Sequence, residues 1–270
     1  MFDNHTQSDG PLRAERFLTA KATPPPIGRE AEIRAIRDAV RPLTTRQVPE
    51  NPLVFGPPGS GKTICVKHVF EALDRETSVK PIRINCWQYR TRPALLTELL
   101  IRLGYPAPRK GKPVDELLGK LREWLTKNRS VALALDEFDQ LQDKTEAAYD
   151  LSMLNQQAEN KLGIVMISNV SPDELMLDER TRSRLNCRTI EFEPYTAAEL
   201  EAILDARIEQ AFVPGSVPQA VREKVATDAA AAGGDCRAAF ERLLQAGRKA
   251  AQEGARELTI EHLDAVDRRD

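Results

Sequence analysis

The chain has 270 residues, of which 30% are charged, with a formal net charge of -2 and a mean hydropathy of -0.44. This balance excludes a chain that is basic over its whole length, so any binding of nucleic acid would need a local patch. No apolar run is long enough to span a membrane and the N-terminus has no signal-peptide core, so we expect a cytoplasmic, globular protein.

The N-terminal residues 1–23 are polar and lack periodicity, so we expect a flexible tail there. Pro24-Pro25-Pro26 then predicts a stiff, extended spacer. After Ile27-Gly28-Arg29, apolar residues recur at Ile33, Ile36 and Val40, which is the spacing of one helix face. We therefore place the start of the folded part at residue 24.

Residues 56–63 match G-x-x-x-x-G-K-[ST], the phosphate-binding loop of nucleotide hydrolases. An apolar run over 53–55 predicts a strand before it, and Val66, Val69, Phe70 and Leu73 predict a helix after it. This context favours a nucleoside triphosphate site over an ordinary Gly/Pro-rich turn. The residues expected around the phosphates are Pro57, Pro58, Gly59, Ser60, Gly61, Lys62, Thr63 and Ile64, with Thr63 also able to ligate Mg²⁺.

Further strands are predicted over residues 81–86, 131–135, 164–167 and 189–192, with helices between them, one of them over 147–161. This alternation predicts an α/β fold with a five-stranded parallel sheet covered on both faces. After Tyr195 the strand pattern stops. A capping box at Thr196–Glu199 opens the first of four predicted helices, so we expect a core over 24–195 and a small all-α domain over 196–270.

Several charged or polar residues follow predicted strands or begin a helix. Asp136 and Glu137 end the third strand, where one acid can hold Mg²⁺ and the other can polarise water. Asn169 ends the fourth strand, although asparagine is also an ordinary turn residue. Arg237 stands in the first turn of a helix, where its charge opposes the helix dipole. This placement is unfavourable unless an anion compensates, so a phosphate partner is favoured.

The segment 87–130 carries ten Arg and Lys against four Asp and Glu, a net charge of 10 − 4 = +6. Such a surface can bind nucleic acid through its phosphates, with strong salt dependence. The alternative is a solvated helical face that balances acids elsewhere. The candidates for DNA contact are Arg90, Arg92, Arg109, Lys110 and Lys112. The four cysteines form no C-x-x-C pair and have no metal-ligand spacing with histidine, so no metal-thiolate site is expected.

Taken in order, the motifs resemble those of an AAA-plus ATPase: GPPGSGKT, LALDEFD, ISN, SRL and GGDCR. The connecting segments IGRE, INC, LDERTRSRL, EFEPY and GGDCRAAFERLLQAG resemble the archaeal replication-initiator family. Its members are related to the eukaryotic origin recognition complex and the cell-division-control helicase loader. The resemblance extends from about Pro26 to Val266 and implies an AAA-plus P-loop core with a helical lid.

The resemblance also implies roles for individual residues. Ile27, Gly28 and Arg29 would line the adenine pocket, and Tyr195 would be the hinge into the lid. Lys62, Thr63, Asp136 and Glu137 would bind Mg²⁺-ATP and activate water, with Asn169 and Arg237 as first and second sensors. Arg184 would be the arginine finger that acts on a neighbouring subunit's ATP, with Arg180 and Arg182 as rivals.

The function so implied is an ATP-binding switch in DNA replication initiation that hydrolyses ATP slowly, as a homo- or hetero-oligomer. Its partners would be duplex DNA, a replicative helicase or other AAA-plus subunits, and it would be nucleoid-associated. Family members continue into a winged-helix domain that this chain lacks, as a shortened piece or a short paralogue, which puts sequence-specific origin binding in doubt. Alternatives are an AAA-plus regulator of a mobile element or defence system, and a paralogue that binds ATP without hydrolysis.

Overall fold

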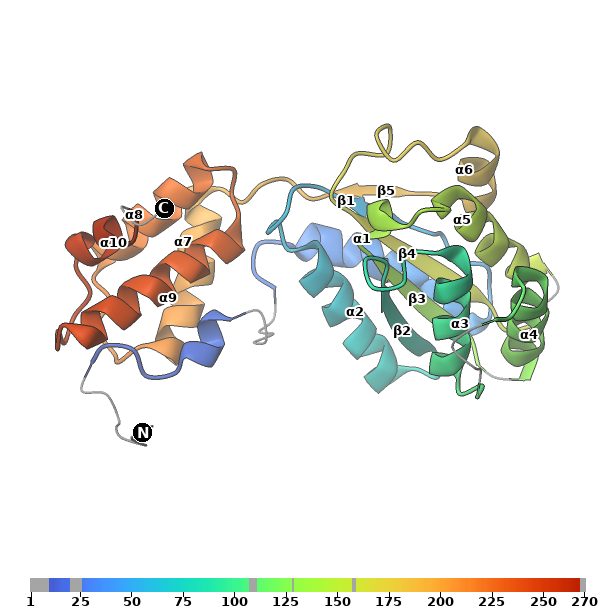
Figure 1. The fold of residues 1–270 in the computed structure, drawn as a ribbon, viewed down its shortest axis with the longest axis horizontal. Helices are drawn as coiled ribbons and strands as arrows, with labels where there is room; N and C mark the ends of the chain where they lie inside the picture. Colours follow the sequence, from blue (N-terminus) through green and yellow to red (C-terminus); the bar gives the residue numbers. More distant parts are fainter. Residues whose placement is uncertain (1–9, 20–25, 107–110, 128, 157–158, 268–270) are drawn as a thin grey trace. The chain divides into compact units, whose positions relative to one another are not determined.

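The computed structural model describes residues 10–19, 26–106, 111–127, 129–156 and 159–267, without the side chains of Lys127 and Gln156. The described residues divide into two units (Figure 1). The sheet unit comprises Arg29–Gly56 and Gly61–Phe192. The helical unit comprises the described parts of Met1–Gly28, Pro57–Ser60 and Glu193–Asp270. The boundary between the units falls at residue 193, and Pro57–Ser60 belong to the helical unit rather than to the sheet unit.

The sheet unit is built on five parallel strands in the order β2-β3-β4-β1-β5. The pairing places Leu53 opposite Met166 on one side and opposite Thr189 on the other. This architecture confirms the predicted five-stranded parallel sheet. The strands are β1 (Leu53–Phe55), β2 (Lys80–Asn85), β3 (Val131–Asp136), β4 (Leu162–Ser168) and β5 (Thr189–Glu191).

Helices cover both faces of this sheet. Successive strand residues point to opposite faces, so Ile164 and Met166 belong to one core cluster and Val165 and Ile167 to another. The first cluster includes apolar residues of α3 (Arg92–Leu103), α4 (Val114–Lys127) and α5 (Lys144–Met153). The second includes residues of α1 (Glu30–Val40) and α2 (Lys62–Glu76).

Two segments differ from the sequence prediction. The helix predicted over 147–161 is α5 (Lys144–Met153) followed by the short 3-10 helix η4 (Leu154–Gln156). Residues 159–161 are not helical, and the side chain of Asn155 bonds both the N–H and the carbonyl oxygen of Leu162 at 2.7 Å. The arginine-rich stretch between β4 and β5, for which the sequence analysis placed no helix, forms α6 (Glu179–Leu185), whose first turn is capped by Asp178, which accepts the Thr181 N–H.

The helical unit contains α7 (Ala197–Ala211), α8 (Gln219–Ala231), α9 (Cys236–Gln252) and α10 (Ile260–Asp267). The capping box predicted at Thr196 is present, since Thr196 and Glu199 bond each other's backbone N–H. The apolar faces of the four helices α7–α10 form one core, which includes Leu200, Leu204, Leu243 and Leu263. Within the described ranges, no helix is both long and apolar enough to cross a membrane.

Residues 10–19 differ from the flexible tail expected over 1–23. They include the 3-10 helix η1 (Glu15–Leu18) and an isolated bridge between Leu12 and Phe212. Leu12 and Leu18 are buried in the core of the helical unit, and Arg248 bonds both carboxylate oxygens of Glu15. Two isolated leucines give no periodic pattern in the sequence, which is why this docking was not predicted.

Candidate nucleotide-binding site

The turn between β1 and α2 has backbone conformations that favour glycine. The φ angles of Gly56, Gly59 and Gly61 are 146°, 74° and 95°, in the region that side chains disfavour. A Cβ on Gly56 would lie 2.1 Å from the carbonyl oxygen of Phe192, the residue after β5. The glycines of the sequence motif are therefore required by the local backbone as well as by any ligand.

The first turn of α2 carries Lys62 and Thr63. The Lys62 ammonium donates to the Gly56 carbonyl oxygen at 2.8 Å, and only 6% of the residue is exposed. The Thr63 hydroxyl donates to Oδ1 of Asp136 at 3.0 Å, which joins the start of α2 to the end of β3. The structure thus brings together three of the residues that the sequence proposed for phosphate and Mg²⁺.

A second pair lies beside them, between the carboxyl ends of β2 and β3. Asn85 is opposite Asp136 in the strand register, and its amide donates to Oε2 of Glu137 at 3.1 Å. Glu137 has a φ of 55°, which turns the chain out of the strand into the 3-10 helix η3 (Phe138–Gln140). The sequence analysis did not single out Asn85, although a polar residue ending a strand next to β3 was a usable signal.

Asn169 follows β4, the other neighbour of β3, at the same edge of the sheet. Its backbone N–H donates to Oδ1 of Asp139 at 3.1 Å, and the residue is exposed. Asp139 also accepts from the side-chain amide of Gln140 at 2.7 Å. This carboxylate fixes the backbone of the Asn169 turn and was likewise missed by sequence analysis.

Arg29, expected near the adenine ring, already has partners within the sheet unit. It is 4% exposed, pairs with Glu32 at 3.0 Å and lies over the ring of Phe192 at 5.5 Å. These contacts make it a structural anchor for the start of α1. The neighbouring Gly28 has a φ of 71°, and Ile27 is partly exposed.

In the helical unit, Arg237 lies in the first turn of α9 as expected and is exposed. Its backbone N–H bonds Asp235, the residue that caps this helix, at 2.7 Å. Tyr195 is buried in the core of the same unit. A Cβ on Gly234 would come within 2.6 Å of the Tyr195 nitrogen, so glycine is required there.

The three candidate finger residues lie on α6 and differ in their contacts. Arg180 and Arg184 are four residues apart, hence on one helix face, and both guanidinium groups lie over the ring of Tyr149, at 5.3 and 5.4 Å. Arg182 instead donates to the carbonyl oxygen of Pro172 at 3.2 Å. All three arginines are exposed.

The candidate DNA-contact residues also differ in whether a carboxylate already neutralises their charge. Arg92 pairs with the partly buried Asp150, and Lys112, before the start of α4, pairs with Glu116 four residues on. Arg90 is exposed and lies 4.9 Å from the ring centre of Trp87, itself 57% exposed. Arg109 and Lys110 lie outside the described residues.

The described cysteine thiols are not suited to metal binding. Burial raises the pKa of Cys65, Cys86 and Cys236 to about 12, so these thiols stay protonated at neutral pH. Among the described residues, no three His, Cys, Asp or Glu side chains gather at one point.

Comparison with known proteins follows the same division of the chain. Residues 46–175 match the family model of an AAA domain, and residues 201–268 match that of a Cdc6 AAA+ ATPase-type lid domain. The structure is similar to the Aeropyrum pernix ORC1 protein solved in complex with DNA. The TM-score is 0.86 at 29% identity, over 98% of this chain and 71% of that one.

Two curated relatives are ORC1-type DNA replication proteins. The Pyrococcus abyssi protein is 34% identical over 87% of this chain and 59% of its own length, so the chain spans little more than half of that relative. The Thermococcus kodakarensis protein is 31% identical over 97% of this chain and 67% of its own length. The chain therefore belongs to the family of ORC1-type DNA replication proteins, and the described residues form its AAA core and lid.

Proposed function

We propose that this chain is an ATP-binding switch in the initiation of DNA replication that hydrolyses ATP slowly. The observation that carries the proposal is the 3.0 Å hydrogen bond between Thr63 and Asp136. It joins the residue after the phosphate-loop lysine to the acid at the end of the central strand. These are the two protein oxygen ligands that Mg²⁺-nucleotide sites of this kind use.

The donor set fits Mg²⁺ with a nucleotide. Mg²⁺ is usually held by one or two protein oxygens, and phosphate oxygens and water complete its coordination. Thr63 and Asp136 would supply those oxygens, and when bound the ion would neutralise charge on the phosphates. Lys62 is held against the phosphate loop by Gly56, so its ammonium is already positioned for the β- and γ-phosphates.

For hydrolysis, we assign Glu137 to polarise the attacking water and Asn169 to orient it. Asn85 would be the positioning residue for Glu137, because its amide holds one carboxylate oxygen at 3.1 Å. Asp139 would do the same for Asn169 through the backbone N–H at 3.1 Å. Arg237 would be the second sensor, and Ile27 and Gly28 would line the adenine pocket.

An arginine finger on α6 would make hydrolysis depend on a second AAA-plus subunit. We retain Arg184 for this role, since its described contacts, the Met153 sulfur at 3.4 Å and the ring of Tyr149, leave its charge uncompensated. An isolated subunit would then bind ATP while hydrolysing it very slowly.

Duplex DNA is the proposed nucleic-acid partner. Within the described part of the basic segment, Arg90 is the best supported contact, because Arg92 and Lys112 are paired with carboxylates. The exposed ring of Trp87 beside Arg90 could also stack on a base or sugar.

The deciding experiment measures binding of fluorescent ATP and steady-state hydrolysis on variants of the same chain. Lys62→Ala should abolish ATP binding, whereas Glu137→Gln should keep it and stop hydrolysis. Lys67→Ala is the matched control, a lysine of the same helix that pairs with Glu71 at 3.7 Å. Wild-type hydrolysis by Glu137→Gln would refute the assignment of the base, and ATP binding by Lys62→Ala would refute the site.

A further inference from the structure

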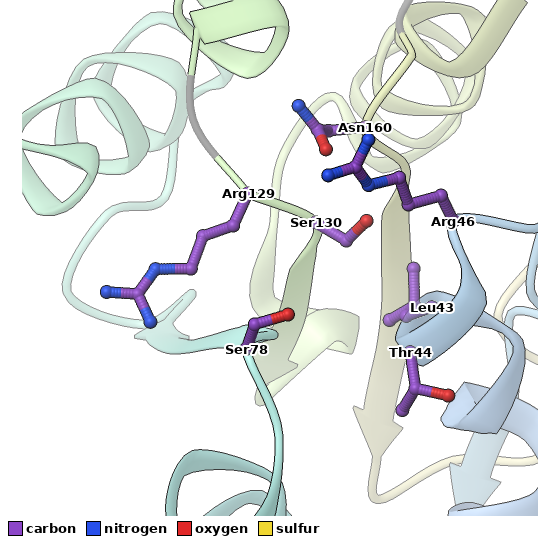
Figure 2. Close-up of a pocket in the computed structure, with 7 residues that line it drawn as sticks. All are labelled: Leu43, Thr44, Arg46, Ser78, Arg129, Ser130 and Asn160. Atoms are coloured by element: carbon purple, nitrogen blue, oxygen red, sulfur yellow. The ribbon is translucent and has the colours of Figure 1, made fainter.

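A pocket of about 330 Å³ lies within the sheet unit, at the amino ends of the strands (Figure 2). The proposed nucleotide site lies at their carboxyl ends, so the six residues of β3 separate the two by about 20 Å. Apart from Leu43, the pocket is lined by polar or charged residues. Those used below are Arg46, Ser78, Arg129, Ser130 and Asn160.

The parallel topology explains why these residues meet. Ser78, Ser130 and Asn160 each stand one or two positions before a strand, and these strands, β2, β3 and β4, are neighbours. The Lys80 N–H bonds the Ser130 carbonyl oxygen and the Val131 N–H bonds the Lys161 carbonyl oxygen, both at 2.8 Å. The floor of the pocket is therefore fixed by the sheet itself.

Ser130 presents an unused donor to this space. It is 5% exposed, and its hydroxyl oxygen accepts the Lys161 N–H at 3.2 Å. No described residue accepts its proton, although buried hydroxyl groups usually find a partner. Figure 2 shows the hydroxyls of Ser78 and Ser130 turned toward the space that the Arg46 guanidinium borders. A ligand with acceptor oxygens would complete the hydrogen bonding of Ser130.

Two arginines line the pocket, and in Figure 2 the side chain of Arg129 extends to the side opposite Arg46. Arg129 is exposed and makes no hydrogen bond or ion pair with the described residues. Arg46 pairs with Glu159 at 2.9 Å, but both side chains are more than half exposed, at 63% and 72%. Such an exposed pair contributes little, so a doubly charged anion can replace the carboxylate. Arg46, Arg129 and Glu159 together carry a net charge of +1 at the pocket.

The backbone at Arg46 has an uncommon conformation. Its φ of 58° lies in the left-handed region, where glycine or asparagine is favoured and a long side chain is uncommon. The residue caps the 3-10 helix η2 (Arg41–Thr45), with its N–H on the Leu43 carbonyl oxygen at 3.2 Å. A long side chain in this costly conformation is consistent with a role for the Arg46 guanidinium in the pocket.

We propose that this pocket binds the terminal phosphate of a small phosphorylated molecule, separately from the nucleotide site. A phosphomonoester carries about −1.5 to −2 charges at neutral pH and three acceptor oxygens. Arg46 and Arg129 supply the charge, and Ser78 and Ser130 supply hydroxyl donors. The volume is at the lower end of the range for small-ligand pockets, about 300–1,000 Å³, which suits a nucleoside monophosphate or free phosphate.

The test is calorimetric titration of inorganic phosphate and, separately, of adenosine monophosphate into the Lys62→Ala chain. Both probes should bind at one site in this background. Adding Arg46→Ala and Arg129→Ala together should weaken phosphate binding by about tenfold or more, because charge-assisted contacts are the strong ones. Adding Arg37→Ala instead is the control, since this exposed arginine of α1 is outside the pocket.

Tighter binding of the monophosphate than of phosphate would identify a nucleotide ligand, and equal binding would identify free phosphate. Phosphate binding that survives the double substitution, or that is absent in the Lys62→Ala chain, would overturn the proposal. ATP binding by the double variant with Lys62 intact shows that the variant is folded. It also keeps failure of this pocket distinct from failure of the nucleotide site.

Discussion

The carboxyl edge of the sheet and the basic segment over 87–130 both carry many charged or polar groups, but these groups have different partners. At the sheet edge, Thr63, Asp136, Asn85 and Glu137 bond one another across three elements. In the basic segment, Arg92, Arg102, Lys112 and Lys120 each pair with a nearby carboxylate. The bonds at the sheet edge assemble a site. In the basic segment, the ion pairs neutralise much of the positive charge that a count from the sequence suggests is free to bind DNA.

Whether a cation of this protein is available to bind an anion depends on its neighbouring carboxylates more than on the local charge count. This difference separates Arg90 from Arg92, and Arg184 from Arg182, which pairs with Asp173 at 3.7 Å, in ways that a motif does not. We therefore compare, in the basic segment, a cation left available with one already paired, and test α6 and a contact of the sheet edge directly.

The largest effect is expected at α6. Arg184→Ala should lower ATP hydrolysis by the assembled subunits by about 10³–10⁵, the value of an arginine finger in phosphoryl transfer, with nucleotide affinity unchanged. Arg180→Ala is the matched variant, since both arginines lie on the ring of Tyr149. The steady-state rate of ATP hydrolysis, measured as a function of protein concentration, gives the effect of both variants. If Arg180→Ala or Arg182→Ala shows the larger loss, the finger is reassigned to that residue.

The next effect concerns the contact that sequence analysis missed. Asn85→Ala should lower the rate of hydrolysis by about 10- to 100-fold, as expected for losing a hydrogen bond to a charged group. ATP affinity should stay within twofold, because Asn85 contacts Glu137 rather than the residues proposed for the phosphates. Single-turnover hydrolysis with saturating ATP isolates the chemical step. A faster rate in the variant would mean that Asn85 holds Glu137 in an inactive orientation.

Sequence reasoning predicted the five parallel strands, the phosphate loop and the helical division because each rests on local periodicity or a contiguous motif. It missed Asn85 and Asp139, whose roles depend on which strands become neighbours in the order β2-β3-β4-β1-β5. It also missed the docking of Leu12 and Leu18, since two isolated leucines carry no periodic signal. It missed as well the side-chain bonds from Asn155 to the backbone of Leu162, which belong to no sequence motif.

A smaller effect should separate two arginines of the basic segment. Arg90→Ala should weaken binding of a short DNA duplex about three- to tenfold and reduce the salt slope by about one. Arg92→Ala should leave DNA affinity unchanged but lower the melting temperature, because it removes the partner of the partly buried Asp150. Fluorescence anisotropy at several salt concentrations and thermal unfolding measure the two quantities. Equal loss of DNA affinity in both variants would mean that the Arg92 pair opens on binding.

The smallest effect is expected at Lys112. This lysine pairs with Glu116 four residues on, and its side chain is 20% exposed. The same hydrogen bond raises its pKa, so it is fully charged at neutral pH yet already compensated. Lys112→Ala should therefore change duplex affinity by less than about twofold, because removing a paired charge changes the field at the surface little. Glu116→Ala releases the lysine and should strengthen DNA binding in the same anisotropy assay. If Glu116→Ala has no effect while Lys112→Ala weakens binding, the lysine contacts DNA despite its pair, and charge compensation is not what separates the two regions.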